Sequence, residues 1–121
     1  MLRPYQTLEE MAESEPSDAF AVGAFDGDEL VSVGLVGPEG DPGGWRVRGM
    51  ASAPRARGRG AGTAVLDALV EHARSHGAGH VWASVRIPAR SLYERAGFVA
   101  DSDVYELPRI GPHVLMRLSM R

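Results

Sequence analysis

The pattern of apolar positions opens with two strand-like runs around a tight turn. Phe20–Phe25 and Leu30–Val36 are both rich in Val, Phe and Leu. Between them stands Asp26-Gly27-Asp28-Glu29, whose Asp-Gly chemistry predicts a hairpin turn. Residues 37–44 hold two Pro and four Gly and predict a loop. Trp45–Ser52 then predicts a strand that stops before Pro54.

A single clear amphipathic helix follows. Its apolar positions have the i, i+1, i+4, i+5, i+8 spacing of one buried helix face. These positions are Val65, Leu66, Leu69, Val70 and Ala73. Gly77 is placed to end the helix.

The remainder of the chain returns to strands. His80–Arg86 alternates, with Val81, Ala83 and Val85 sharing one face. Pro88 suits the first turn of a second, much shorter helix that Gly97 ends. Val104–Leu107 and Val114–Met120 predict a final pair of strands, separated by residues 108–112.

Composition sets limits on this arrangement. The 121 residues and 13.0 kDa are those of one domain, and we expect residues 1–121 to form a single domain. There is no cysteine, which excludes disulfides, thiolate nucleophiles and Cys-based zinc sites. Met1–Glu10 has no apolar signal region, and no apolar run approaches the ~18 residues of a membrane span. We therefore expect a cytoplasmic protein without a membrane partner.

Charge is segregated along the chain. Residues 1–44 carry ten carboxylates against Arg3 alone, whereas residues 45–121 carry twelve arginines against six carboxylates. The basic part would attract anions such as phosphates, nucleic acid or an anionic cofactor. Nucleic acid fits poorly, because the Arg55–Arg59 cluster lies at a helix start and has no interleaved aromatic residues.

A glycine-rich arginine loop stands between the predicted strand and the predicted helix. Backbone N–H groups of such a loop, together with those of the first helical turn, form an anion site, and glycine lets a phosphate approach the backbone. Gly58, Gly60 and Gly62 do not have the Gly-x-Gly-x-x-Gly spacing of dinucleotide-binding folds. A P-loop needs lysine, which the chain lacks.

The pattern that fits is Arg57-Gly58-Arg59-Gly60-Ala61-Gly62, which resembles the pyrophosphate-binding motif of the GNAT superfamily of acetyl-CoA-dependent N-acetyltransferases. Met50-Ala51-Ser52-Ala53-Pro54 resembles the end of that family's bulged fourth strand. Ala89-Arg90-Ser91-Leu92-Tyr93-Glu94-Arg95-Ala96-Gly97-Phe98 resembles its A-x-x-x-Y-x-x-x-G-F segment, and Gly111–Met116 its last strand. The resemblance implies an α/β (α+β) fold with a mixed, largely antiparallel twisted sheet of about six to seven strands. Two main helices would accompany it, with the N-terminal helices reduced.

The resemblance also implies roles for individual residues. Tyr93 would be the catalytic residue, a proton donor to the departing thiolate, and backbone N–H groups around Met50–Ser52 would polarise the thioester carbonyl. The general base is left open between His113 and Glu106, either of which can also be structural. Trp82 and Ser84 are candidates to line the acceptor groove. The residues expected to bind acetyl-CoA are Met50, Ala51, Ser52, Arg57, Gly58, Arg59, Gly60, Ala61, Gly62, Thr63, Arg86 and Ala89.

The function expected is direct acetyl transfer from acetyl-CoA to a primary amine, without a metal. Arg86 stands where the family often has Asn, and the region before the second strand is short. A non-catalytic acetyl-CoA-binding module is therefore the alternative. His72 and His76 have an i, i+4 spacing, but no H-E-x-x-H pattern accompanies them, so we expect no metal site. A reduced helical wall would leave apolar surface and a sheet edge exposed, which predicts a homodimer.

Overall fold

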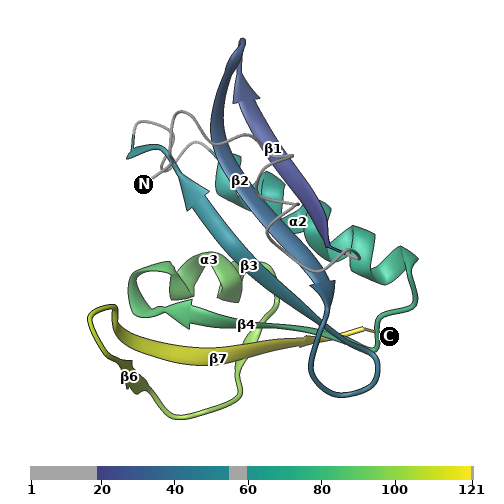
Figure 1. Cartoon of the computed structure of the whole chain (residues 1–121), viewed down its shortest axis with the longest axis vertical. Coiled ribbons are helices and arrows are strands. Elements are labelled where there is room, and N and C mark those ends of the chain that lie inside the picture. The colour runs from purple at the N-terminus through teal and green to yellow at the C-terminus, as the bar shows by residue number, and fades with distance from the viewer. Residues whose placement is uncertain (1–18, 55–59, 121) are drawn as a thin grey trace.

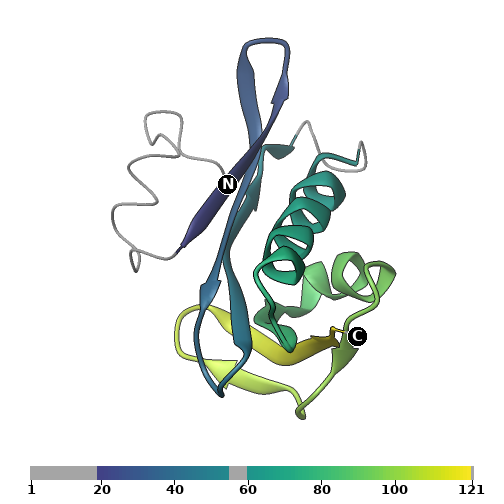
Figure 2. The same ribbon diagram turned by 90° about the vertical axis from the view of Figure 1, so that its right-hand side faces the viewer.

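The computed structural model describes residues 19–54 and 60–120, which form one twisted seven-stranded sheet with helices on one face (Figures 1 and 2). The strand order is β1-β2-β3-β4-β7-β5, with β6 also paired to β7. Only β3 and β4 run parallel, and every other neighbouring pair is antiparallel. The predicted fold class is therefore confirmed. The strands are β1 Phe20–Asp26, β2 Glu29–Pro38, β3 Gly44–Ser52, β4 His80–Arg86, β5 Val99–Ala100, β6 Tyr105–Leu107 and β7 Gly111–Ser119.

The hairpin predicted around Asp26-Gly27 is present. Asp26 pairs with Glu29, so Gly27 and Asp28 alone form the turn. Gly27 has a φ of 63°, the left-handed conformation that hairpin turns of this length require. The local sequence thus determines how β1 returns to β2.

Helix α2, Ala61–Ser75, covers the sheet through the predicted apolar face. The five predicted positions are its buried residues, and they pack in one core cluster with residues of the sheet such as Val36 and Val81. Gly77, with a φ of 80°, follows the helix end at His76 as predicted. Helix α3, Arg90–Arg95, lies on the same side of the sheet as α2 (Figure 2).

Several details differ from the sequence prediction. The second helix begins with a 3₁₀ turn, η2, at Ile87–Ala89, because Pro88 has no N–H to donate to a regular helical ladder. Strand β7 begins at Gly111, three residues earlier than predicted, since Leu107 pairs with Gly111 across a tighter turn. The two-residue strand β5 was not predicted, because both of its side chains are exposed and give no buried pattern.

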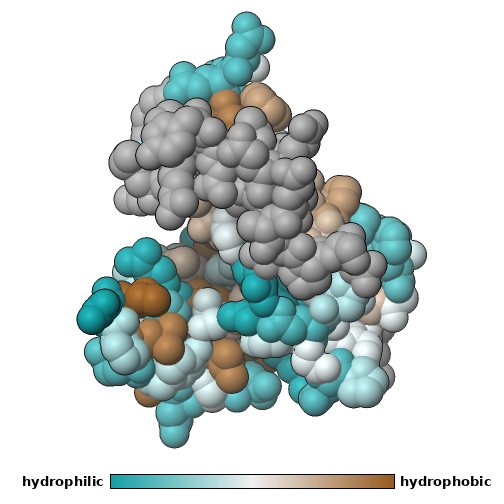
Figure 3. Space-filling view, in the orientation of Figure 1, coloured by the Kyte–Doolittle hydropathy of each residue, from teal (hydrophilic) through white to brown (hydrophobic). Residues whose placement is uncertain are grey.

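The surface carries few large apolar side chains. Val104 and Ile110 are each 54% exposed, near the β6–β7 turn. Figure 3 shows apolar surface gathered over this end of the sheet. In the ranges described above, no helix combines the length and apolar character that crossing a membrane requires.

Candidate functional site

A bulge in β3 opens the sheet where the sequence predicted it. Val33 pairs with Ala51 and Leu35 with Arg48, so Gly49 and Met50 both lie opposite Gly34. Gly49 has a φ of 68°, a conformation that glycine adopts without strain. The extra residue bends the strand just before the stretch that was predicted to bind the cofactor.

Strands β3 and β4 separate beyond this point. Their parallel pairing joins Gly44–Arg46 to His80–Trp82 and stops there, and the two strands diverge in Figure 1. The divergence leaves backbone groups of β3 facing β4 without a partner in the described sheet. The Ala53 N–H donates to the Val31 carbonyl oxygen of β2. Because backbone groups point to alternate sides along a strand, the backbone N–H and C=O groups of Ser52 and Met50 face the β4 side. Those of Ala51, paired with Val33, face β2.

The start of α2 lies against the end of β3. A Cβ atom on Gly62 would be 3.5 Å from Ser52 Oγ and 3.7 Å from Leu92 Cδ2. The structure therefore brings together the predicted strand end, the first turn of α2 at Gly62 and the helix that carries Tyr93. The buried hydroxyl of Ser32, on β2, also reaches Ser52, with 2.8 Å between the two Oγ atoms. The sequence analysis missed Ser32, which stands in a continuous apolar run.

The N-terminus of α2 has no side-chain cap. Gly60, with φ 87° and ψ 0°, occupies the N-cap position without a side-chain capping bond. The first intrahelical bond runs from Ala64 N to Gly60 O, so the N–H groups of Ala61, Gly62 and Thr63 precede the helical ladder. No acidic residue stands in the first turn to repel an anion. Arg57, Gly58 and Arg59, the other predicted loop residues, lie outside the described part of the chain.

Tyr93 is a buried residue of α3. Its ring meets Phe98 edge to face, with centroids 5.2 Å apart and planes at 88°. Burial raises the pKa of Tyr93 to about 12. The phenol therefore stays protonated at every physiological pH, so it can donate a hydrogen bond but does not act as a phenolate base.

Comparison with known proteins decides the family. The model of the acetyltransferase (GNAT) family matches residues 2–98. The chain belongs to the GNAT acetyltransferase family. A curated relative, the N-acetyltransferase YitI of Bacillus subtilis strain 168, whose activity is uncharacterized, is 26% identical over 128 residues covering 100% of this chain and 86% of YitI.

Solved structures agree with this assignment. A GNAT-family protein of Desulfovibrio desulfuricans has a TM-score of 0.73 and 27% identity, covering 91% of this chain and 74% of its own. A Bacillus subtilis acetyltransferase solved in complex with CoA has a TM-score of 0.73, covering 93% of this chain and 84% of its own. At 18% identity the latter shows the fold alone.

Two further predicted cofactor residues of this GNAT chain lie at the end of β4. Arg86 is the last residue of the strand, and its side chain is exposed. Ala89 ends the 3₁₀ turn η2 and packs partly buried against the core. Both residues lie on the connection between β4 and the helix of Tyr93.

On the face of the sheet opposite the helices, Trp82 fixes the β2–β3 loop. Its Nε1 donates to the Glu39 carbonyl oxygen over 2.9 Å, and the Arg46 guanidinium lies 4.8 Å above its ring centroid. The Glu39 carboxylate binds both Arg46 and Arg48. Burial alone would raise the pKa of Glu39, but the two guanidinium groups hold it below its ordinary value. Trp82 therefore lies outside the core cluster, and its place in the acceptor groove stays a prediction.

Ser84, the second acceptor-groove candidate, lies on the same face in a polar contact. Its Oγ is 2.5 Å from the Tyr105 hydroxyl oxygen. His113 is 5% exposed, pairs with Tyr105 across β6 and β7, and has its ring centroid 6.1 Å from that of Tyr105. The sequence analysis missed Tyr105, because its strand is only three residues long. Glu106, the other candidate base, is exposed.

The two helix histidines take part in an aromatic stack. His72 stacks on Phe20 with 3.7 Å between ring centroids and on His76 with 4.1 Å. Burial, and secondarily His76, lowers the pKa of His72. Within residues 19–54 and 60–120, no three or more His, Asp or Glu side chains gather as metal ligands would.

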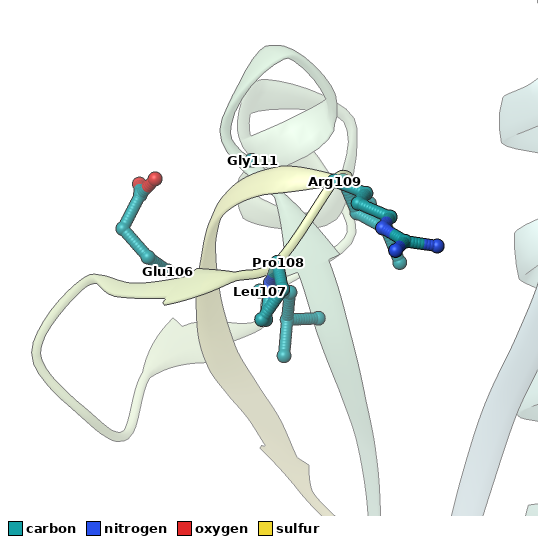
Figure 4. A pocket seen from close by; sticks show the side chains of 6 residues that line it. Glu106, Leu107, Pro108, Arg109 and Gly111 are labelled. Atoms are coloured by element: carbon teal, nitrogen blue, oxygen red, sulfur yellow. The ribbon is translucent and has the colours of Figure 1, made fainter.

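A surface hollow lies elsewhere, over the β6–β7 turn. It is lined by residues of that turn, among which Glu106 and Arg109 point away from each other (Figure 4). Arg109 has a φ of 69°. The hollow is formed by one short turn and takes no residue from the bulge, the α2 start or α3, so it is separate from the site described above.

Proposed function

We propose that this protein transfers an acetyl group from acetyl-CoA directly to a primary amine. The observation that carries the proposal is the divergence of β3 and β4 beside the uncapped start of α2. This arrangement offers an anion site for the pyrophosphate of CoA next to backbone N–H groups for the thioester. Family membership and the CoA complex of a structural neighbour support the same substrate.

Backbone groups would polarise the thioester carbonyl. The alternation along β3 directs the N–H groups of Met50 and Ser52 toward the diverging edge. Fixed N–H donors stabilise the negative charge that develops on a carbonyl oxygen during acyl transfer, and loss of one such donor costs about 10²–10³ in rate in other acyl transferases. The hydroxyl contact between Ser32 and Ser52 holds this strand end in place.

Tyr93 would assist departure of the thiolate as a hydrogen-bond donor. Its pKa of about 12 keeps the proton on the phenol oxygen. The thiolate of a thiol with a cysteine-like pKa of ~8.5 is a weaker base than this phenolate by about 3.5 pK units. This difference opposes complete proton transfer from the phenol to the sulfur by roughly 5 kcal/mol. A hydrogen bond that strengthens as charge grows on sulfur avoids that cost.

Acetyl-CoA binding is tested first. Acetyl-CoA and CoA should raise the melting temperature, because a ligand that binds only the native state stabilises it, and ATP should raise it less. A shift with ATP and none with millimolar CoA would contradict the proposal.

Turnover is tested with a panel of primary amines, following CoA release with a thiol reagent. The chain has no cysteine, so the reagent reports only released CoA. Release that depends on an amine supports acetyl transfer. Binding without release for any amine would support the alternative, a non-catalytic acetyl-CoA-binding module.

We further propose a homodimer that covers the apolar end of the sheet near the β6–β7 turn. Val104 and Ile110 are both exposed there. Light scattering at high protein concentration should give twice the 13.0 kDa chain mass for the wild type, and the mass of one chain for Ile110→Asp. A wild-type monomer contradicts this proposal.

The cytoplasmic location, the single domain and the lack of a nucleic-acid partner stay predictions of the sequence.

A further inference from the structure

One loop residue binds both of the strands that diverge at the proposed acetyl site. Glu39 follows directly after β2, and its carboxylate binds Arg46 and Arg48 of β3, with 2.9 Å between Arg46 Nη1 and Glu39 Oε2. Its carbonyl oxygen accepts the indole N–H of Trp82 of β4 over 2.9 Å. Its own N–H donates to the Gly44 carbonyl oxygen over 3.0 Å, which closes the loop between β2 and β3. Together these contacts form the Glu39 clamp.

The Glu39 clamp lies where the pairing of β3 with β4 ends. Arg46 and Trp82 are the last residues that pair, and the Arg46 guanidinium lies over the Trp82 ring. Arg48 stands two residues further along β3, so its side chain is on the same face of the sheet as that of Arg46. Directly beyond Arg48 comes the bulge of β3. Glu39 thus binds β3 both at its last paired residue and two residues beyond it.

The ion pairs of the Glu39 clamp are shielded from water in part. The side chains of Glu39, Arg46 and Arg48 are 35%, 29% and 31% exposed, whereas those of the Glu71–Arg74 pair on α2 are 71% and 47% exposed. Partial burial strengthens the attraction between opposite charges. Burial acts to raise the pKa of Glu39, but the two guanidinium groups lower it below its ordinary value, so the carboxylate is charged at neutral pH.

The two strands lead to the two halves of the proposed catalytic site. Strand β3 continues to Met50 and Ser52, whose N–H groups face the β4 side. Strand β4 continues through η2 into α3, which carries Tyr93. The separation of the strands therefore sets the distance between the N–H donors for the carbonyl oxygen and the hydroxyl donor for the sulfur.

We infer that Glu39 is a positioning residue that fixes the separation of β3 and β4 and, through it, the geometry of acetyl transfer. This inference rests on the proposed function. Glu39 acts through Arg46, Arg48 and Trp82, and it takes no part in the pyrophosphate site proposed at the start of α2. A displacement of about 1 Å caused by a change remote from the chemistry can lower a rate by about 10²-fold. Loss of the clamp should therefore slow the chemical step more than it weakens CoA binding.

The structural part is tested by NMR on the free protein. Glu39→Gln keeps the size of the side chain and removes its charge, and Glu71→Gln makes the same change in the exposed pair with Arg74. Glu39→Gln should shift the backbone amide resonance of Ser52, four residues beyond Arg48, whereas Glu71→Gln should leave it at its wild-type position. An unchanged Ser52 amide in Glu39→Gln would overturn the inference, whether or not the protein binds CoA.

The catalytic part is tested with acetyl-CoA and the amine that the panel identifies. Glu39→Gln should lower kcat by about tenfold to 10²-fold, while the Kd for CoA stays within a few-fold in calorimetry. Rates are expressed per folded protein, with the folded fraction taken from urea unfolding, and Glu71→Gln should keep the wild-type kcat. A wild-type kcat in folded Glu39→Gln protein would assign Glu39 a role in stability alone.

Failure of the proposed function gives a different result. A wild type that does not bind CoA, or that releases none with any amine, contradicts acetyl transfer by this protein. The Ser52 amide then still decides whether Glu39 fixes the separation of the two strands.

A second variant removes the contact of the clamp with β4. Trp82→Phe removes the indole N–H that binds the Glu39 carbonyl oxygen and keeps an aromatic ring beside Arg46. It should shift the same Ser52 amide and lower kcat in the same way. Because both variants act on one clamp, the double variant should lose no more than the more damaging single variant. Losses that multiply would mean that Glu39 and Trp82 act separately, against the inference. Should Glu39→Gln fail to fold, Trp82→Phe provides both comparisons in its place.

Discussion

A Cβ atom on Gly34 would lie 2.5 Å from the sulfur of Met50, so the bulge of β3 packs directly on the bare backbone of β2. The same Cβ would lie 2.8 Å from Leu69 Cδ1 and 3.0 Å from Val65 Cγ1 of α2. Gly34 is therefore the point where the bulge, the neighbouring strand and the helix meet. Its lack of a side chain makes room for Met50, one of the residues proposed to bind the thioester.

Gly34→Ala should destabilise the protein by about 1–3 kcal/mol, because an added methyl group in a filled site displaces its neighbours. Urea unfolding measures the change. Gly79→Ala is the matched control, since its Cβ would meet nothing closer than 3.6 Å, and it should change stability by less than about 0.5 kcal/mol. Equal stability of the two variants would contradict the packing described at Gly34.

Gly60→Val should weaken CoA binding by tenfold or more, because a β-branched side chain would stand where the pyrophosphate approaches. Gly77→Val is a close control at the other end of α2. Both glycines have a left-handed φ, 87° and 80°, and a Cβ atom added to either would have no other atom within 4 Å. Both variants should lose about 1–2 kcal/mol of stability, but only Gly60→Val should lose CoA affinity in calorimetry. If folded Gly60→Val protein bound CoA with unchanged affinity, the start of α2 would not be the site of the pyrophosphate.

Tyr93→Phe should lower kcat by about 10²-fold with CoA affinity kept within a few-fold. The ring still packs edge to face on Phe98, and only the hydroxyl is lost. The loss should appear in kcat as well as kcat/KM, because the hydrogen bond forms as the thiolate leaves. Steady-state kinetics and thermal unfolding are measured on the same sample. A stability change with near-normal turnover would make Tyr93 a core residue only.

Alkaline pH provides a separate test of Tyr93. Its pKa is about 12 in the folded protein against 10.0 for the unperturbed group, so the folded state holds this proton more tightly. The contribution to stability is complete below pH 10 and is lost as the pH rises toward 12, by about 3 kcal/mol in all. Urea unfolding at pH 8, 10 and 11 should show the wild type losing more stability than Tyr93→Phe. If the wild type and Tyr93→Phe lost the same stability between pH 8 and pH 11, the Tyr93 phenol would be exposed to solvent.

The local sequence was sufficient to predict most elements. The hairpin turn at Gly27 and Asp28, the α2 face that contains Leu66 and Leu69, and the alternation of His80–Arg86 all lie where they were predicted. In each case a local feature of the sequence, either the turn residues or the period of the apolar positions, matches the burial of those positions in the folded protein. Strand β5 escaped prediction because two exposed residues carry no such period.

The sequence by itself determined the family, through the glycine-rich motif Arg57–Gly62 and the segment around Tyr93. Glycine is needed in the first motif because a ligand must approach the backbone closely. Only the tertiary structure decided which groups meet. Ser84 and Tyr105 are 21 positions apart, and the contact between them depends on β7 lying between their strands. Long-range pairing is an outcome of packing the whole sheet, so no local pattern in the chain encodes it.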